Sequence, residues 1–400
     1  MISIKEAEKL IAYNVPQPKI ASLDTNKSPG FVLANDIFAP WGSPAFTSSA
    51  MDGFAVKWDD VKAATKQNPI SLKIAGESQA GIPFRKDLKH GEAVRISTGG
   101  KVPSGSDTVI PIEDCYDKNS LIEILNVSKK KQAIRFEGEE LEKGSLLLEK
   151  GTLIGGRHLA LLVSMGITTI NVFARPSISL IVSGTELVDY WGKKEDSQIY
   201  DTNSPMLSSL IIENGGDLKS VTRIADSLED TIDSIKQATD LSDLLIISGG
   251  VSVGPHDYIK KAAEVCGFKR IFWRVNQKPG KPFFFARMKN KLLFGLPGNP
   301  VSAYMGFFHY IRPAIAIMCG KSGEREKSKM ILGNDYFVEG DRREFLRVSI
   351  TDGFAKILNR QGSHMLSSIS MADGYIIADG NSHLKKGISI DVYYFPDRRP

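Results

Sequence analysis

Hydrophobic and polar residues follow a clear pattern between residues 176 and 320. Short apolar runs alternate there with segments in which apolar residues recur at helical spacing. The runs predict strands at 178–183, 218–224, 244–248 and 291–296, with two more at RIFWRV and PFFFAR. The helical spacing predicts helices at 204–216, 227–238 and 300–318, and one more that begins near Asp257. Nearly all-apolar strands that alternate with helices are typical of a parallel sheet covered on both faces, so we expect a doubly wound α/β domain over 176–325.

The rest of the chain has a different pattern. Residues 41–134 contain short strands separated by turns and predict a β-rich unit, and residues 326–400 predict a small β-barrel or sandwich. Residues 1–40 have a helical pattern before the chain becomes rich in proline and glycine, and a second helix is predicted at 152–168, with Gly166 at its C-cap. The charged stretch at 130–144 marks either a domain boundary or a solvated surface loop.

Composition and charge narrow the class of protein. The 400 residues are 42% hydrophobic and 24% charged, which excludes a mostly disordered chain. A net charge of +5 suits an anionic small molecule but is too diffuse to indicate nucleic acid. The three cysteines lie far apart without a C-x-x-C pair, so neither a disulfide framework nor a zinc site is expected. Without a signal peptide or an apolar run of about 18 residues, we expect a soluble, cytoplasmic protein.

Polar residues gather where the predicted strands end. Ligands of open α/β sheets bind outside the carboxyl ends of the strands, and carboxylates follow three of them: Glu186, Asp226 and Asp257. Glycine-rich turns expose backbone N–H groups that suit phosphate, and a hard cation such as Mg²⁺ would bridge phosphate and carboxylates. The three carboxylates are therefore the candidate metal ligands. The candidate phosphate contacts are Ser248, Gly249, Gly250, Ser252 and Gly254 in SGGVSVGPHDY (248–258), and Pro297, Gly298, Asn299 and Pro300 after the strand at 291–296.

Each of these features also has a purely structural interpretation. The glycine turn could simply connect a strand to a helix, and Asp226 or Asp257 could cap the helix that follows. Asp201 could likewise serve a turn or cap instead of a ligand, and Lys278 and Lys281 could be solvated loop lysines instead of phosphate contacts. Carboxylates and glycine turns at four strand ends together favour a binding site. The sequence contains no G-x-G-x-x-G, Walker A, G-x-S-x-G or H-E-x-x-H motif.

Four motifs together resemble the molybdopterin molybdenumtransferases, the MoeA family, which includes the gephyrin E domain. They are SAMDGFAV (49–56), RISTGGKVPSGSDTVIPIE (95–113), SGGVSVGPHDY (248–258) and GLPGNPVSA (295–303), and SGTELV (183–188) and IYDTN (199–203) add to the match. The resemblance covers nearly the whole chain. It implies four domains: an extended domain of 1–40 and 135–175, an inserted β-rich domain of 41–134, a molybdopterin-binding α/β domain of 176–325 and a C-terminal β-barrel of 326–400.

The resemblance also implies a reaction. Molybdenum from molybdate is inserted into adenylylated molybdopterin with release of AMP, and Mg²⁺ assists. The implied catalytic residues are Asp52, Thr98, Glu186, Asp226 and Asp257, with Pro297 and Pro300 as further functional positions. Taken alone, Asp52 and Thr98 have the appearance of ordinary turn residues, so their assignment depends on the resemblance.

A homodimer is implied as well. Its active site would lie between the α/β domain of one subunit and the inserted and C-terminal domains of the other, and an adenylyltransferase and recipient molybdoenzymes would be its partners. Two alternatives stay open. One is a molybdopterin adenylyltransferase on the same α/β fold, although the roughly 250 residues outside 176–320 argue against a single-domain activity. The other is a dimeric, gephyrin-like scaffold, although such a protein would not need the rim carboxylates that this sequence retains.

Overall fold

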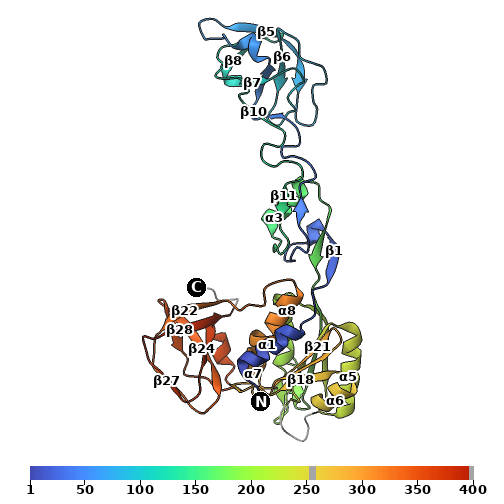
Figure 1. The fold of residues 1–400 in the computed structure, drawn as a ribbon, viewed down its shortest axis with the longest axis vertical. Coiled ribbons are helices and arrows are strands. Elements are labelled where there is room, and N and C mark those ends of the chain that lie inside the picture. Colours follow the sequence, from blue (N-terminus) through green and yellow to red (C-terminus); the bar gives the residue numbers. More distant parts are fainter. Residues whose placement is uncertain (252–257, 396–400) are drawn as a thin grey trace. The chain divides into compact units, whose positions relative to one another are not determined.

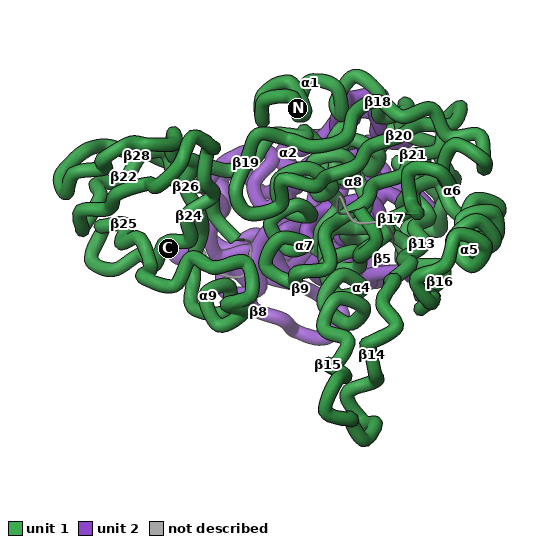
Figure 2. Tube along the Cα trace, turned by 90° about the horizontal axis from the view of Figure 1, so that it is seen from below, with its two compact units in different colours: residues 1–34, 151–156, 169–400 green, residues 35–150, 157–168 purple. Residues whose placement is uncertain are grey.

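The computed structural model describes residues 1–251 and 258–395, and its chain forms two compact units. Unit 1 comprises residues 1–34, 151–156 and the chain from 169 onward, and unit 2 comprises residues 35–150 and 157–168 (Figure 2). The division into four domains predicted above is finer than these two units and stays a prediction. None of the described helices is long and apolar enough to cross a membrane.

Unit 1 contains a six-stranded sheet in the order β16-β13-β17-β21-β20-β18. The strands are β13 (Ser177–Ser183), β16 (Asp217–Ile224), β17 (Leu244–Ser248), β18 (Lys269–Trp273), β20 (Phe284–Met288) and β21 (Lys291–Leu296). The first four in the spatial order are parallel, as predicted. The last two pair in antiparallel fashion, because no helix separates RIFWRV from PFFFAR or PFFFAR from β21.

Helices cover both faces of this sheet, which confirms the doubly wound α/β fold (Figure 1). One face packs against α1 (Ile4–Asn14), α4 (Asn203–Glu213) and a helical run from α7 (Pro300–Gly306) through a π-helical turn (Phe307–Ile311) to α8 (Arg312–Met318). The other face packs against α5 (Leu228–Leu241) and α6 (Ile259–Val265). Strand β17 shows the alternation: Leu244 and Ile246 face the first layer, and Leu245 and Ile247 face the second.

The helical expectation for residues 1–40 is wrong beyond residue 14. A capping box between Ser3 and Glu6 starts α1, and the helix ends before Pro16 and Pro18, which have no N–H to continue it. Residues Ile20–Asp24 instead form β1, which pairs in antiparallel fashion with β12 (Thr169–Phe173). The helix predicted at 152–168 is shorter than expected, α3 (Gly156–Ser164), and Gly166 follows it with a φ of +64°.

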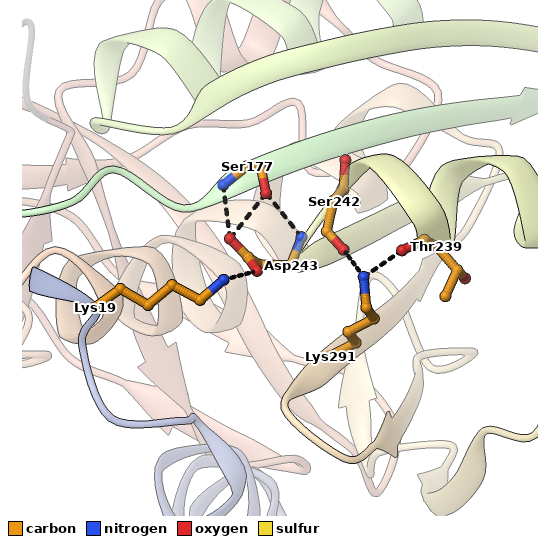
Figure 3. A network of polar contacts seen from close by, with 6 residues as sticks. All are labelled: Lys19, Ser177, Thr239, Ser242, Asp243 and Lys291. Carbon is orange, nitrogen blue, oxygen red and sulfur yellow. Dashed lines mark hydrogen bonds and ion pairs between the residues drawn. The ribbon is translucent and has the colours of Figure 1, made fainter. Parts of the chain in front are cut away.

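A polar network fixes the base of the β1–β12 ribbon to the sheet (Figure 3). Lys19, just before β1, donates to Asp243 Oδ1 over 2.6 Å, and the hydroxyl of Ser177 donates to Asp243 Oδ2 over 2.8 Å. Lys291 donates to the carbonyl oxygens of Ser242, at 2.9 Å, and of Thr239 at the end of α5. The amino ends of β13, β17 and β21 are therefore joined by side chains as well as by the sheet.

The C-terminal part of unit 1 is a closed five-stranded barrel, which decides between the two predicted architectures. Its strands follow the order β24-β25-β22-β28-β26, and β26 pairs back with β24. They are β22 (Lys327–Leu332), β24 (Arg343–Thr351), β25 (Phe354–Ile357), β26 (Gly374–Ala378) and β28 (Ser389–Tyr394). A separate strand pair, β23 (Tyr336–Val338) with β27 (Ser382–Leu384), adds Val338 to the barrel core, and the short helix α9 (Ser367–Ser370) follows the loop after β25. Strand β19 (Gln277–Lys278), from the α/β region, pairs with β24.

Unit 2 is built on a second six-stranded sheet in the order β7-β4-β6-β5-β9-β8. Its strands are β4 (Gly53–Val56), β5 (Ile70–Ser78), β6 (Glu92–Ile96), β7 (Thr108–Pro111), β8 (Cys115–Asp117) and β9 (Leu121–Ile124). Phe54, Val56 and Ile110 belong to its core, beside the short helix α2 (Trp58–Val61). Two small strand pairs, β3 (Ser48–Ser49) with β10 (Ile134–Arg135) and β2 (Ile37–Phe38) with β11 (Leu146–Leu148), also belong to the unit, as does nearly all of α3.

Candidate functional site

A cavity of about 680 Å³ lies at the carboxyl ends of β13, β17 and β21. Its wall combines loops of the α/β region with the barrel of the same chain. The residues that line it include Ser183, Glu186, Asp201, Asn203, Gly250, Lys278, Lys281, Pro297, Gly298, Asn299, Pro300, Arg342, Gln361 and Ser363. The cavity thus occupies the edge of the sheet where the sequence predicted a binding site, and it presents side chains of both charges.

The rim carboxylates take different places around this cavity. Glu186 is exposed and lines it, just before the pair β14 (Leu187–Val188) and β15 (Ile199–Tyr200). Asp226 lies behind Ser183, which lines the cavity. It accepts a hydrogen bond of 2.5 Å from the Ser183 hydroxyl. Asp226 is not the cap of α5, since Ser227 caps that helix by accepting from the Asp230 amide. Asp257, the third predicted carboxylate, lies outside the described residues.

The start of α4 contributes Asp201 and Asn203. Asp201 is buried and accepts from the backbone amide of Ser204 over 2.9 Å and from its hydroxyl, so the structural interpretation of Asp201 has direct support. It lines the cavity as well. Asn203, which sequence reasoning placed in a motif but not in the site, donates to Ser248 Oγ (2.9 Å) and to the carbonyl of Gly298 (2.8 Å). Its buried Oδ1 has no hydrogen-bond partner among the residues that the structure describes and is available to a donor.

The glycine turn after β17 needs its glycines for steric reasons. Gly249 has a φ of +95°, and a Cβ there would lie 2.3 Å from the carbonyl oxygen of Ser183. Gly250, with a φ of +63°, lines the cavity. Ser248 is fully buried, and its hydroxyl contacts Asn203 and the carbonyl of Pro297. It therefore supports two residues that line the cavity. Ser252 and Gly254 lie outside the described residues.

Basic side chains supply the positive charge of the cavity. Lys278 belongs to β19 and lies 3.1 Å from Oε1 of the buried Glu344 in β24, so it is held in place and is not a freely solvated loop lysine. Lys281 lines the cavity three residues later. Arg342 comes from the barrel and donates to the carbonyl of Gln277 over 3.4 Å. Three cationic side chains on one cavity favour a phosphate-bearing ligand.

The proline loop and the barrel meet at this cavity. All four residues of the loop, Pro297–Pro300, line it, and Asn299 Nδ2 donates to Ser363 Oγ over 3.3 Å. Sequence reasoning missed the barrel residues Arg342, Gln361 and Ser363. The only available signal was the charged run at 341–343 before a predicted strand. The resemblance implied that the other subunit supplies the barrel wall, whereas in this structure the barrel of the same chain lines the cavity.

Asp52 and Thr98 form a separate pair in unit 2. They lie 46 residues apart, at the start of β4 and after β6, and the pairing of Gly53 with Ile96 brings them together. Thr98 donates to Asp52 Oδ1 from its amide (2.6 Å) and from its hydroxyl (3.0 Å). These hydrogen bonds, the one from the amide first, hold the pKa of Asp52 below its ordinary value. Both side chains are exposed, so an ionised carboxylate is presented to solvent.

Metal binding has a limited structural basis within 1–251 and 258–395. No group of three or more histidine, cysteine, aspartate or glutamate side chains there could hold a metal ion. Of the predicted ligands, Glu186 and Asp226 are described, and both offer the carboxylate oxygens that Mg²⁺ prefers.

The chain matches three family models in order along its length. They are the MoeA N-terminal region (domain I and II) over residues 2–166, a "probable molybdopterin binding domain" over 179–316 and the MoeA C-terminal region (domain IV) over 329–395. These matches run through both compact units.

Whole-length relatives agree. A molybdopterin molybdenumtransferase of Staphylococcus epidermidis is 31% identical over 399 residues, covering 98% of this chain and 95% of the relative. The Haemophilus influenzae protein of the same name is 30% identical, covering 98% and 99%. A crystal structure of a MoeA molybdopterin biosynthesis protein from Pyrococcus horikoshii has a TM-score of 0.86 at 29% identity, over 98% of this chain and 99% of that one. The chain therefore belongs to the MoeA family.

Proposed function

We propose that this protein is a molybdopterin molybdenumtransferase of molybdenum cofactor biosynthesis. It would insert molybdenum from molybdate into adenylylated molybdopterin and release AMP. The observation that carries the proposal is the cavity at the carboxyl ends of β13, β17 and β21, which is lined by Lys278, Lys281 and Arg342 as well as by the acidic Glu186 and Asp201. The relatives that match nearly the whole chain bear this name.

The cationic side chains would bind the phosphates of the substrate. Lys278 is kept in position by the buried Glu344, and Arg342 by the carbonyl of Gln277. The Oδ1 of Asn203, which lacks a partner within 1–251 and 258–395, would accept a hydrogen bond from the substrate, while the Nδ2 group of Asn203 fixes its orientation. The backbone of Gly250 adds a surface without a side chain, so the substrate can approach closely.

The acidic side chains would hold Mg²⁺. Glu186 and Asp226 would be ligands, with Asp257 as the third candidate, and Mg²⁺ would neutralise charge on the departing AMP. Ser183 orients Asp226 by donating a hydrogen bond to its Oδ1, and Oδ2 would be the oxygen that holds the metal ion. The carboxylate oxygens of Glu186 and Asp226 are the kind of ligand that the hard cation Mg²⁺ prefers.

The proposal includes a cytoplasmic homodimer. Asp52 and Thr98 would act on the cavity of the partner subunit, where the lowered pKa of Asp52 keeps its carboxylate charged. The resemblance supports this assignment, together with the exposure of the pair on unit 2. The adenylyltransferase that makes the substrate and the enzymes that receive the cofactor would be its partners.

The test supplies adenylylated molybdopterin, molybdate and Mg²⁺ and measures the release of AMP. We expect release that depends on all three, and Asp226→Ala should fold like the parent but lose at least about 100-fold in rate. ATP-dependent adenylylation without AMP release would identify an adenylyltransferase instead. Full activity of Asp226→Ala would reject the site, and a parent without either activity would favour a scaffold.

A further inference from the structure

Arg347 is a fully buried arginine in the barrel strand β24. Its neighbours Leu346 and Val348 belong to the barrel core, whereas Arg347 lies on the opposite face of the strand, as Phe345 does. Burial lowers the pKa of its guanidinium to about 10, so the group stays charged at neutral pH. A buried charge is unfavourable unless it is fully hydrogen-bonded, so the bonds that Arg347 makes indicate what it is for.

The guanidinium donates to neutral oxygens of the loop after β25, of β24 itself and of α9. One Nη2 group donates to the carbonyls of Arg360 (3.3 Å) and Gly362 (3.4 Å). Nη1 donates to the carbonyl of Phe345 (3.3 Å), and Nε to Ser368 Oγ (3.2 Å) at the start of α9. The planar guanidinium therefore joins the loop after β25 to the strand and to α9, which a lysine could do only in part.

Gln361, in the same loop, forms hydrogen bonds with the backbone of Arg347. Its Oε1 accepts from the backbone amide of Arg347 (3.0 Å), and its Nε2 donates to the carbonyls of Arg347 (2.9 Å) and Leu358 (2.8 Å). The loop 358–363 is thus held by hydrogen bonds to both the side chain and the backbone of Arg347. It reaches the cavity through Gln361 and Ser363, and Ser363 accepts from Asn299 of the proline loop.

We propose that Arg347 is a positioning residue that locks the loop 358–363 and so fixes the barrel wall of the substrate cavity. It touches no substrate itself. The inference rests on the proposed function only where catalysis is measured, because the lock can be tested without substrate. Its consequence is that loss of the guanidinium frees one loop and displaces Gln361 and Ser363, while the barrel core around Leu346 and Val348 stays intact.

Arg347→Met removes the donors and keeps a side chain of similar length, and Arg343→Met is the matched control. Arg343 lies on the same strand, but its guanidinium is partly exposed and pairs with Asp379 over 2.6 Å. The first measurement is limited proteolysis with trypsin, which cuts after Arg360, at the carbonyl that Arg347 holds. We expect cleavage there at least about tenfold faster in Arg347→Met than in the parent, and no change in Arg343→Met.

Hydrogen exchange shows whether the loosening is local. We expect faster exchange confined to 358–363 and to the amide of Arg347, which donates to Gln361, with the other amides of β22, β24 and β28 unchanged. Equal cleavage of variant and parent, or faster exchange spread evenly over the barrel, would overturn the proposal, because Arg347 would then act only on global stability. If Arg347→Met does not fold, Gln361→Met removes the other half of the lock and must give the same loop-confined pattern.

The third measurement is enzyme activity. In AMP release, kcat/KM should fall on the order of 10²-fold in Arg347→Met at a temperature where the fold is intact, as for a misplaced binding group. Arg347→Lys should recover part of this loss, and unchanged kcat/KM in Arg347→Met would also contradict the proposal. A parent that releases no AMP would count against the proposed function alone, since proteolysis and exchange would still decide on the lock.

Discussion

Gly249 comes directly before Gly250, which lines the cavity, and its position leaves no space for a side chain. Its φ is +95°, and a Cβ at this position would lie 2.3 Å from the Ser183 carbonyl oxygen, which leaves no room for a side chain. Gly387 has nearly the same φ, +92°, but a Cβ there would meet nothing within 4 Å. The two positions therefore share the conformational cost of a non-glycine residue and differ only in the close approach.

We predict that Gly387→Ala lowers the free energy of unfolding by about 1 kcal/mol, and that Gly249→Ala lowers it by at least about 2 kcal/mol more. The difference arises because the backbone at Ser183 must move to accept a methyl group, and that movement also shifts the wall of the cavity. Urea unfolding of both variants under the same conditions measures it. Equal losses in the two variants would show that the close approach to Ser183 costs nothing.

At the scale of elements, Asp243 holds the β1–β12 ribbon to the sheet (Figure 3). Burial raises the pKa of Asp243, but the hydrogen bonds from Lys19 and Ser177 outweigh it and leave the pKa below the ordinary value of 3.8. A carboxyl group whose pKa is lower in the folded state stabilises the fold above its unfolded-state pKa. That contribution is lost as the pH falls through the folded-state pKa.

Asp243→Asn should therefore reduce the free energy of unfolding at pH 7 by about 1–3 kcal/mol, since charged hydrogen bonds are lost in a partly buried site. The difference from the parent should shrink once the pH falls below about 4. Asp217→Asn is the control, because Asp217 forms an exposed surface ion pair with Lys219 and its loss should change stability by less than about 1 kcal/mol. Urea titrations at pH 7 and at about pH 3 test both statements. A difference that stays constant between them would rule out the carboxylate as its source.

Elements were predictable from the sequence where burial leaves a clear pattern. Strand β17 is buried along its whole length, so LLIIS is a continuous apolar run. Strand β1 is mostly exposed, and IASLD carries neither an apolar run nor a clean alternation, so its pairing with β12 could not be predicted. Strand β19 has two residues and exists because β24 lies beside it, a long-range contact that local sequence does not encode.

The same distinction applies to the site. Glu186 and the loop Pro297–Pro300 follow predicted strands directly, so their place on one edge of the sheet could be worked out from topology. Arg342 and Ser363 reach that edge only because the barrel packs against the α/β region, and the charged run at 341–343 alone does not indicate which sheet edge it will meet. For Ser248 the local sequence was misleading. Its position in a glycine turn suggested ligand contact, whereas its buried hydroxyl accepts a hydrogen bond from Asn203.

At the scale of the whole molecule, the proposed function joins two parts of the site on different units. Asp52 and Thr98 lie in unit 2, and Glu186 lies on the cavity of unit 1. If each active site of the proposed homodimer combines unit 2 of one subunit with the cavity of the other, two different inactive variants can repair each other. In a heterodimer of Asp52→Ala and Glu186→Ala, one site would combine the intact cavity of the first with the intact Asp52 of the second.

We predict that each variant alone folds with an unchanged melting temperature and loses at least about 100-fold in AMP release. Both side chains are exposed, so their removal should leave the fold intact. Heterodimers made by co-expression with two different affinity tags, and purified through both, should recover about half the activity of the parent dimer, because one of two sites is complete. Asp59→Ala, in place of Asp52→Ala, is the control for an exposed aspartate of unit 2 and should leave full activity by itself. If the tandem-purified heterodimer stays as inactive as either parent variant, Asp52 and Glu186 act within one chain, and the shared site of the proposed homodimer is refuted.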